Sequence, residues 1–159
     1  MPSELHTRAV ALADAGFLWR VYASTRFDEI AAFGWPPAQQ EAFLRMQYRA
    51  RCQSYAATYP DAENLILVAD GIDAGSISIH RKSSEMRLID IAFLPEYRNK
   101  GLGAQAIQGL IREACERSIP LRLSVLRGNP AIRLYLRVGF REISADPMYI
   151  EMECHGQPG

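Results

Sequence analysis

The alternation of apolar and polar residues divides the chain into a helical first part and a longer part in which strands alternate with helices. A short strand is expected over 5–10. Apolar residues at helical spacing after Asp14, and again over 27–33, predict two short helices. Pro37 opens a longer helix that reaches about Thr58, because a proline in the first turn of a helix sacrifices no hydrogen bond.

From residue 64 onward the pattern changes from helical to strand-like spacing. Strands bounded by turn residues are expected over 64–69, 74–81, 87–94, 121–126 and 147–154. The segment 87–94 is apolar on both faces except at Asp90, which is typical of a central strand covered by helices on each side. Helical spacing follows Gly103 and again follows Pro130. The pattern therefore predicts a single α/β domain over 1–159, with a mixed sheet and interleaved helices.

The composition of the chain is that of an ordinary soluble domain. The chain has 159 residues, of which 48% are hydrophobic and 23% are charged. Its three cysteines are odd in number and show no paired spacing, so we expect neither a metal site nor a disulfide framework. The start of the chain lacks the pattern of a signal peptide, and no stretch approaches the roughly 18 apolar residues of a membrane helix. We therefore expect a cytoplasmic protein.

The charges balance overall but are unevenly distributed along the sequence. Eighteen basic residues face eighteen acidic ones, which argues against a nucleic-acid-binding protein and against a polybasic membrane-surface protein. Residues 98–141, however, contain nine basic and two acidic residues, a net charge of +7, and the remainder carries −7. This segment either presents solvated helix faces or forms a local site for a polyanionic ligand. Charge alone does not choose between them.

A glycine-containing loop joins the strand 87–94 to the next helix. Glycines allow the backbone to approach an anion closely, and the start of a helix offers unpaired N–H groups at the positive end of its dipole. A phosphate or pyrophosphate would suit such a loop, although an ordinary strand-to-helix turn has the same outline. Residues 101–106 also fit the dinucleotide pattern G-x-G-x-x-A. Six residues separate that pattern from its strand, and the next strand ends at Arg127 rather than at an acidic residue, so we do not expect a nicotinamide cofactor.

Two motifs place this loop in a known context. Residues 98–103 read R-x-x-G-x-G between a strand and a helix, and residues 129–135 read N-P-A-x-x-L-Y before Gly139 and Phe140. Over about 88–140 the chain resembles the GCN5-related N-acetyltransferases, the GNAT superfamily. The resemblance implies a central mixed sheet with a splayed pair of parallel strands and helices on both faces.

The resemblance also implies where acetyl-coenzyme A binds. The cosubstrate would lie between strands 87–94 and 121–126, with the backbone of Ile91, Ala92 and Phe93 pairing with its pantetheine arm. Asn129 is expected to cap a helix and is a second candidate for a pantetheine contact. The pyrophosphate would be wrapped, mostly by main-chain N–H groups, by residues Arg98, Asn99, Lys100, Gly101, Leu102, Gly103 and Ala104. Arg133 or Arg137 would serve the third phosphate.

The implied reaction is the transfer of an acetyl group to a primary amine of a small molecule or peptide by direct attack in a ternary complex. Tyr135 matches the family tyrosine that protonates the leaving thiolate, whereas helical spacing alone would make it a core aromatic residue. The identity of a general base stays open among Asp90, Glu29, His80 and Glu85, and ordered water is a further alternative. The Asn129–Tyr135 spacing is six residues where many members have seven, which weakens the assignment of the asparagine more than that of the tyrosine.

The acceptor is expected to meet the first two helices, around 27–47, and the hairpin at 81–86. Phe33, Trp35 and the acidic pair at 28–29 would suit a cationic, partly apolar amine. The alternative function is a non-catalytic module of the same fold that binds acyl-coenzyme A and acts as a regulatory or interaction domain. The resemblance leaves a homodimer open.

Overall fold

The computed structural model describes residues 4–155. Its centre is a seven-stranded sheet in the order β1-β2-β3-β4-β5-β7-β6, in which β4 and β5 are parallel and all other neighbours are antiparallel. The strands are β1 (Leu5–Ala9), β2 (Glu63–Ala69), β3 (Ile72–Arg81), β4 (Met86–Phe93), β5 (Leu121–Leu126), β6 (Arg141–Ala145) and β7 (Tyr149–Cys154). The helices are α1 (Ala15–Ala31), α2 (Pro37–Thr58), α3 (Leu102–Glu116) and α4 (Ala131–Val138), with short 3-10 turns at Leu12–Asp14 and Pro95–Tyr97.

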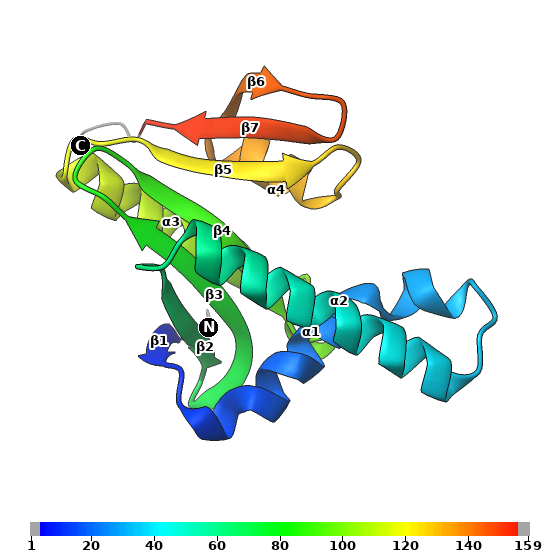
Figure 1. Cartoon of the computed structure of the whole chain (residues 1–159). Helices are drawn as coiled ribbons and strands as arrows, with labels where there is room; N and C mark the ends of the chain where they lie inside the picture. The colour runs from blue at the N-terminus through cyan, green and yellow to red at the C-terminus, as the bar shows by residue number, and fades with distance from the viewer. Residues whose placement is uncertain (1–3, 156–159) are drawn as a thin grey trace.

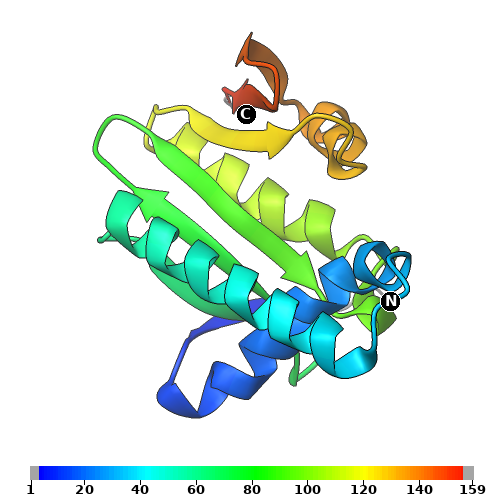
Figure 2. The same ribbon diagram turned by 45° about the vertical axis from the view of Figure 1, so that its right-hand side comes forward.

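Helices lie on both faces of the sheet, as the sequence predicts (Figures 1 and 2). Helices α1 and α2 lie over the middle of the sheet on one face, and α3 lies on the other. The main core joins the inner sides of the strands to α3 and α4, with Ile107, Leu121 and Met152 almost fully buried. The opposite face of β5 and β7 carries exposed side chains such as Ser124 and Tyr149. That half of the sheet is therefore open on the side of α2.

The mixed sheet and its interleaved helices confirm the predicted α/β fold, with three differences in the elements considered next. The segments expected to form two helices after Asp14 are one continuous helix, α1, because no glycine or proline interrupts it between Gly16 and Gly34. Strand β6 was not expected, because all five of its side chains are exposed and give no alternation of apolar and polar positions. The last strand begins at Tyr149 rather than at 147, since Asp146 Oδ1 accepts N–H groups from Met148 and Tyr149 in the preceding turn.

The parallel strands β4 and β5 are paired over only part of their length. Residues 86–88 pair with residues 121–123, and beyond that point the strands separate (Figure 2). Between β3 and β4 the register shifts so that Ile89 has no partner, a β-bulge that bends β4. The bulge also places Arg87 and Asp90, three residues apart, on the same face of the sheet, because one extra residue reverses the alternation of side chains. Both side chains therefore face α2 and the open half of the sheet.

The described residues 4–155 contain no helix that is long and apolar enough to cross a membrane. All three cysteines are free, and Cys154 is buried.

Candidate active site

The loop after β4 presents a continuous run of unpaired backbone N–H groups. Asn99 and Gly101 both adopt positive φ, at 61° and 79°, and the first helical hydrogen bond of α3 runs from Gln105 N to Gly101 O at 3.0 Å. Within the described residues, no N–H from Asn99 to Ala104 donates a hydrogen bond. Successive N–H groups in alternating right- and left-handed conformations form a concave anion site, and here the positive end of α3 adds to it. The loop therefore presents a concave set of unpaired N–H groups, the kind of site to which an anion can bind.

Arg98 holds this loop in place through its side chain. Its Nε donates to the Phe93 carbonyl at the end of β4 at 2.9 Å, and its Nη2 donates to Ser24 Oγ on α1 at 3.0 Å. Its own N–H donates to Pro95 O at 3.2 Å. Arg98 thus joins the strand, the loop and α1, and its backbone adds no free N–H to the anion site. Its predicted contact with a pyrophosphate stays a prediction.

The free edge of β4 lies directly before this loop. Leu94 donates its N–H to Ala74 O of β3 at 2.9 Å, so the alternation of an antiparallel pair turns the N–H groups of Phe93 and Ile91 away from β3 and toward β5. The backbone of Ala92 faces β3 instead. Because β5 has already separated from β4 here, the groups of Ile91 and Phe93 are available to a ligand. Of the three residues expected to meet pantetheine, these two have the suitable backbone direction.

Tyr135 lies on α4 and packs into the main core, which also contains Leu88 and Phe93 of β4. Its side chain is 8% exposed and packs with its ring 5.8 Å from that of Phe140. Burial raises the pKa of the Tyr135 phenol to about 12, with a smaller contribution from the negative charge of Asp90. Within residues 4–155 its hydroxyl makes no hydrogen bond, and its oxygen is not one of the fully buried polar atoms without a partner, so it keeps some access to solvent or a ligand. Tyr135 is thus both a core residue and a neutral O–H donor near β4.

Asn129 precedes α4, and two of the basic residues of the segment 98–141 lie on that helix. Asn129 Oδ1 accepts the N–H of Ala131 at 2.9 Å, but the N-cap of α4 is Pro130, so Asn129 lies one residue before the cap position expected of it. Arg133 and Arg137 are exposed on α4. Within the described part of the chain, six of the nine basic residues between 98 and 141 have no carboxylate partner; they are Arg98, Lys100, Arg112, Arg127, Arg133 and Arg137. Much of the local positive charge is therefore not neutralised by neighbouring side chains.

Each of the four candidate bases lies against a neighbouring side chain. Three carboxylates form ion pairs: Asp90 with Arg51 at 2.6 Å, Glu29 with Arg26 at 3.0 Å, and Glu85 with Arg122 at 3.3 Å. His80 is buried, and its ring lies 5.4 Å from that of Tyr59. The structure does not single out one of the four as a free base.

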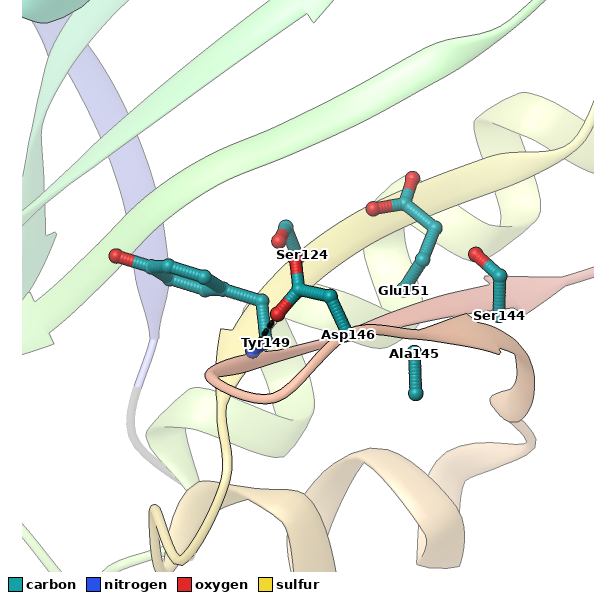
Figure 3. A pocket seen from close by; sticks show the side chains of 6 residues that line it. All are labelled: Ser124, Ser144, Ala145, Asp146, Tyr149 and Glu151. Atoms are coloured by element: carbon teal, nitrogen blue, oxygen red, sulfur yellow. Dashed lines mark hydrogen bonds between the residues drawn. The ribbon is translucent and has the colours of Figure 1, made fainter.

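A hollow on the open half of the sheet was not expected from the sequence (Figure 3). It is lined by Ser124, Ser144, Ala145, Asp146, Tyr149 and Glu151. Glu151 is held by Arg87 of β4 at 2.5 Å, and Figure 3 shows the Tyr149 ring extending away from the other lining residues. A sequence feature that could have pointed to this side of the site is Arg51, a charged residue at helical spacing with Leu44 and Tyr48 on the inner side of α2.

Comparison with known structures shows the same fold in several acetyltransferases. The chain is similar to the PaiA N-acetyltransferase of Thermoplasma acidophilum in complex with coenzyme A (21% identity, 96% of this chain and 99% of that one, TM-score 0.69). It is also similar to Ard1 of Thermoplasma volcanium (19% identity, 94% and 95%, TM-score 0.63). A third similar structure is the ribosomal-protein-S18-alanine N-acetyltransferase of Escherichia coli (18% identity, 98% and 96%, TM-score 0.62). At these identities the likeness shows the fold.

Sequence comparison supplies the family. A search of curated proteins found no significant match. The profile described as the acetyltransferase (GNAT) family matches residues 20–140, which include the loop 98–104, the free edge of β4 and Tyr135. The match covers most of the chain and agrees with the resemblance carried by the two motifs, so this protein belongs to the acetyltransferase (GNAT) family.

Proposed function

We propose that this protein is an N-acetyltransferase that moves an acetyl group from acetyl-coenzyme A to a primary amine of a small molecule or peptide. The observation that carries the proposal is the run of unpaired N–H groups from Asn99 to Ala104, directly after the free edge of β4. An anion site and an unpaired strand edge suit the two parts of coenzyme A, its pyrophosphate and its amide-containing arm. A structure of the same fold that holds coenzyme A supports the choice of cosubstrate.

The residues present fit this cosubstrate group by group. The N–H groups of residues 99–104 would hold the pyrophosphate, and Ile91 and Phe93 would pair with the pantetheine amides. One of the two strand N–H groups would also face the thioester carbonyl and stabilise the negative charge that develops on its oxygen. Arg133 and Arg137 are the candidates for the third phosphate, because both are exposed cations without a carboxylate partner in the described part of the chain.

Bound acetyl-coenzyme A supplies a thioester whose sulfur must accept a proton as it leaves. Tyr135 would donate that proton, because its raised pKa of about 12 keeps the phenol neutral at physiological pH. The four candidate bases are ion-paired or buried, so we propose that the acceptor ammonium loses its proton to solvent before attack. The tyrosine is then reprotonated from solvent.

The phosphate-binding part of the proposal is tested by a charge at Gly101. A Cβ at this position would meet no heavy atom within 4 Å, and asparagine and aspartate tolerate positive φ better than other residues. Gly101→Asn and Gly101→Asp therefore differ mainly in one negative charge inside the anion site. We expect calorimetric Kd values for acetyl-coenzyme A to be at least about tenfold weaker for the aspartate variant than for the asparagine variant, and the gap to shrink as salt rises. Equal Kd values would refute the assigned phosphate site.

The transfer step is tested by thiol release from acetyl-coenzyme A across polyamines, amino acids, aminoglycosides and peptide N-termini. Release above background hydrolysis with at least one class supports the enzyme. Tight binding of acetyl-coenzyme A with no release in any class would favour the non-catalytic binding module instead.

A further inference from the structure

Arg51 projects from α2 toward the open half of the sheet and is held there rigidly. Its guanidinium lies 5.3 Å from the centre of the Tyr22 ring and 5.2 Å from that of the Tyr55 ring. Its Nη2 forms an ion pair with Asp90 Oδ1 of β4 at 2.6 Å. Stacking on aromatic rings and pairing with a carboxylate fix the plane of an arginine side chain. Arg51 is thus a preorganised guanidinium.

This guanidinium keeps unused hydrogen-bonding capacity. An arginine carries five N–H donors, and Asp90 is the one carboxylate partner of Arg51 within residues 4–155. The Arg51 side chain is 31% exposed and that of Asp90 is 32% exposed, so both charges of the pair are open to a small molecule. A second carboxylate can therefore bind beside the first without displacing it.

The pair also lies next to the proposed transfer centre. Asp90 immediately precedes Ile91, whose N–H faces the gap between β4 and β5, and the negative charge of Asp90 contributes to the raised pKa of Tyr135. On the other side, Tyr149 at the hollow contributes to the raised pKa of Tyr55, which places the two phenols near each other. Arg51 and Asp90 thus lie near both the proposed reacting groups and the hollow.

We infer that the acceptor is an α-amino acid or a similar zwitterion, whose carboxylate binds Arg51 while its amine lies against Asp90. This inference rests on the proposed acetyl transfer. In an α-amino acid the amine and the carboxylate are close together. They can therefore reach Asp90 and Arg51 at the same time, because Arg51 Nη2 and Asp90 Oδ1 are only 2.6 Å apart. A purely cationic acceptor would be attracted by Asp90 but repelled by Arg51, whereas a zwitterion meets an opposite charge at each end. The side chain of the amino acid would extend toward Ser124, Tyr149 and Glu151 of the hollow.

This assignment replaces the cationic acceptor that the acidic pair at 28–29 suggested. Both residues of that pair are exposed on α1, whereas Asp90 lies on β4 directly before Ile91. In the reaction the amine nitrogen bonds to the acetyl carbon, the C–S bond breaks, and the sulfur takes the proton of Tyr135. The nitrogen then loses its surplus proton to solvent, and the tyrosine regains one from solvent. The products are an N-acetyl amino acid, coenzyme A thiol and one proton released to solvent.

The test compares each L-amino acid with its α-carboxamide, which keeps the amine and the side chain but lacks the carboxylate. For the best amino acid we expect kcat/KM to exceed that of its amide by about tenfold or more, as for a charge-assisted hydrogen bond. Arg51→Gln should bring this ratio close to one, and Arg51→Lys should give an intermediate ratio, because a lysine keeps the charge but not the planar fork. Arg49→Gln, on the same helix at an exposed position, is the matched control and should leave the ratio unchanged.

Equilibrium binding separates failure of the inference from failure of the proposed function. The same amino acids and amides are titrated by calorimetry into the protein saturated with coenzyme A. If acetyl-coenzyme A is not consumed with any amine, the proposed function fails. The inference would still be supported if the protein binds an amino acid but not its amide, and if Arg51→Gln abolishes that binding. Equal use or equal binding of acid and amide, or a ratio unchanged by Arg51→Gln, would overturn it.

Discussion

Removal of the Tyr135 hydroxyl is the change that most directly separates catalysis from cosubstrate binding. The phenol has a pKa of about 12 in the folded protein. Two units above the ordinary value of about 10 correspond to about 2.7 kcal/mol in favour of the neutral form, and at about pH 8 roughly one molecule in ten thousand carries a phenolate. Tyr135 is therefore available as a proton donor throughout the working range. Loss of a general acid typically lowers the rate by about 100- to 10,000-fold.

The same substitution is expected to leave folding almost unchanged. The hydroxyl makes no hydrogen bond in the described residues, and the ring of Tyr135→Phe keeps its contact with Phe140. We therefore expect a free energy of unfolding within about 0.5 kcal/mol of the parent and an acetyl-coenzyme A Kd within about twofold.

The assay is single-turnover transfer at saturating acetyl-coenzyme A, which reports the chemical step even when product release limits kcat. Urea denaturation and calorimetric binding on the same preparation supply the controls. A Tyr135→Phe rate within threefold of the parent would refute the role of the phenol as the acid. A loss of affinity equal to the loss of rate would reassign Tyr135 to cosubstrate binding.

Three further predictions concern the frame around the site. Gly75→Ala places a Cβ 2.2 Å from a carbonyl oxygen of β4, so urea denaturation should show that the free energy of unfolding falls by at least about 3 kcal/mol. Gly109→Ala lies in the middle of α3, where the nearest atom to the new Cβ is 3.9 Å away, and should raise the free energy of unfolding by about 0.5–1 kcal/mol. Equal midpoints for the two variants would contradict this reasoning. Arg98→Gln should lower both Tm and acetyl-coenzyme A affinity, because it removes the anchor of the loop; lost affinity at unchanged Tm would show a direct ligand contact instead. Burial raises the pKa values of Tyr48 and Tyr135 to about 12, above the unfolded value of about 10, so their contribution to stability is complete below about pH 10 and is lost between about pH 10 and 12. Urea unfolding across that range, with phenolate absorbance as the monitor, should show the decline, and a flat profile would argue against it.

Features that depend on local sequence were predictable. Helix α2 has the predicted bounds, because a proline at its first turn and another just beyond its end act on the adjacent backbone. Strand β5 has its predicted bounds, since its alternate residues are buried and exposed in the pattern of a half-covered strand. The loop before α3 was predictable for the same reason. Positive φ at Gly101 and unpaired N–H groups at the start of a helix depend on a few neighbouring residues only.

The sequence by itself thus determined the α/β alternation, the glycine-containing loop before α3 and the family. Tertiary structure decided which way the functional groups point. The bulge at Ile89 turns Asp90 toward α2, and Arg98 reaches back to β4 and α1 rather than out of its loop. The pairing of Arg51 with Asp90 joins residues thirty-nine positions apart in the sequence. Long charged side chains choose partners by proximity and burial in the finished fold, and neither is encoded in the spacing of neighbouring residues.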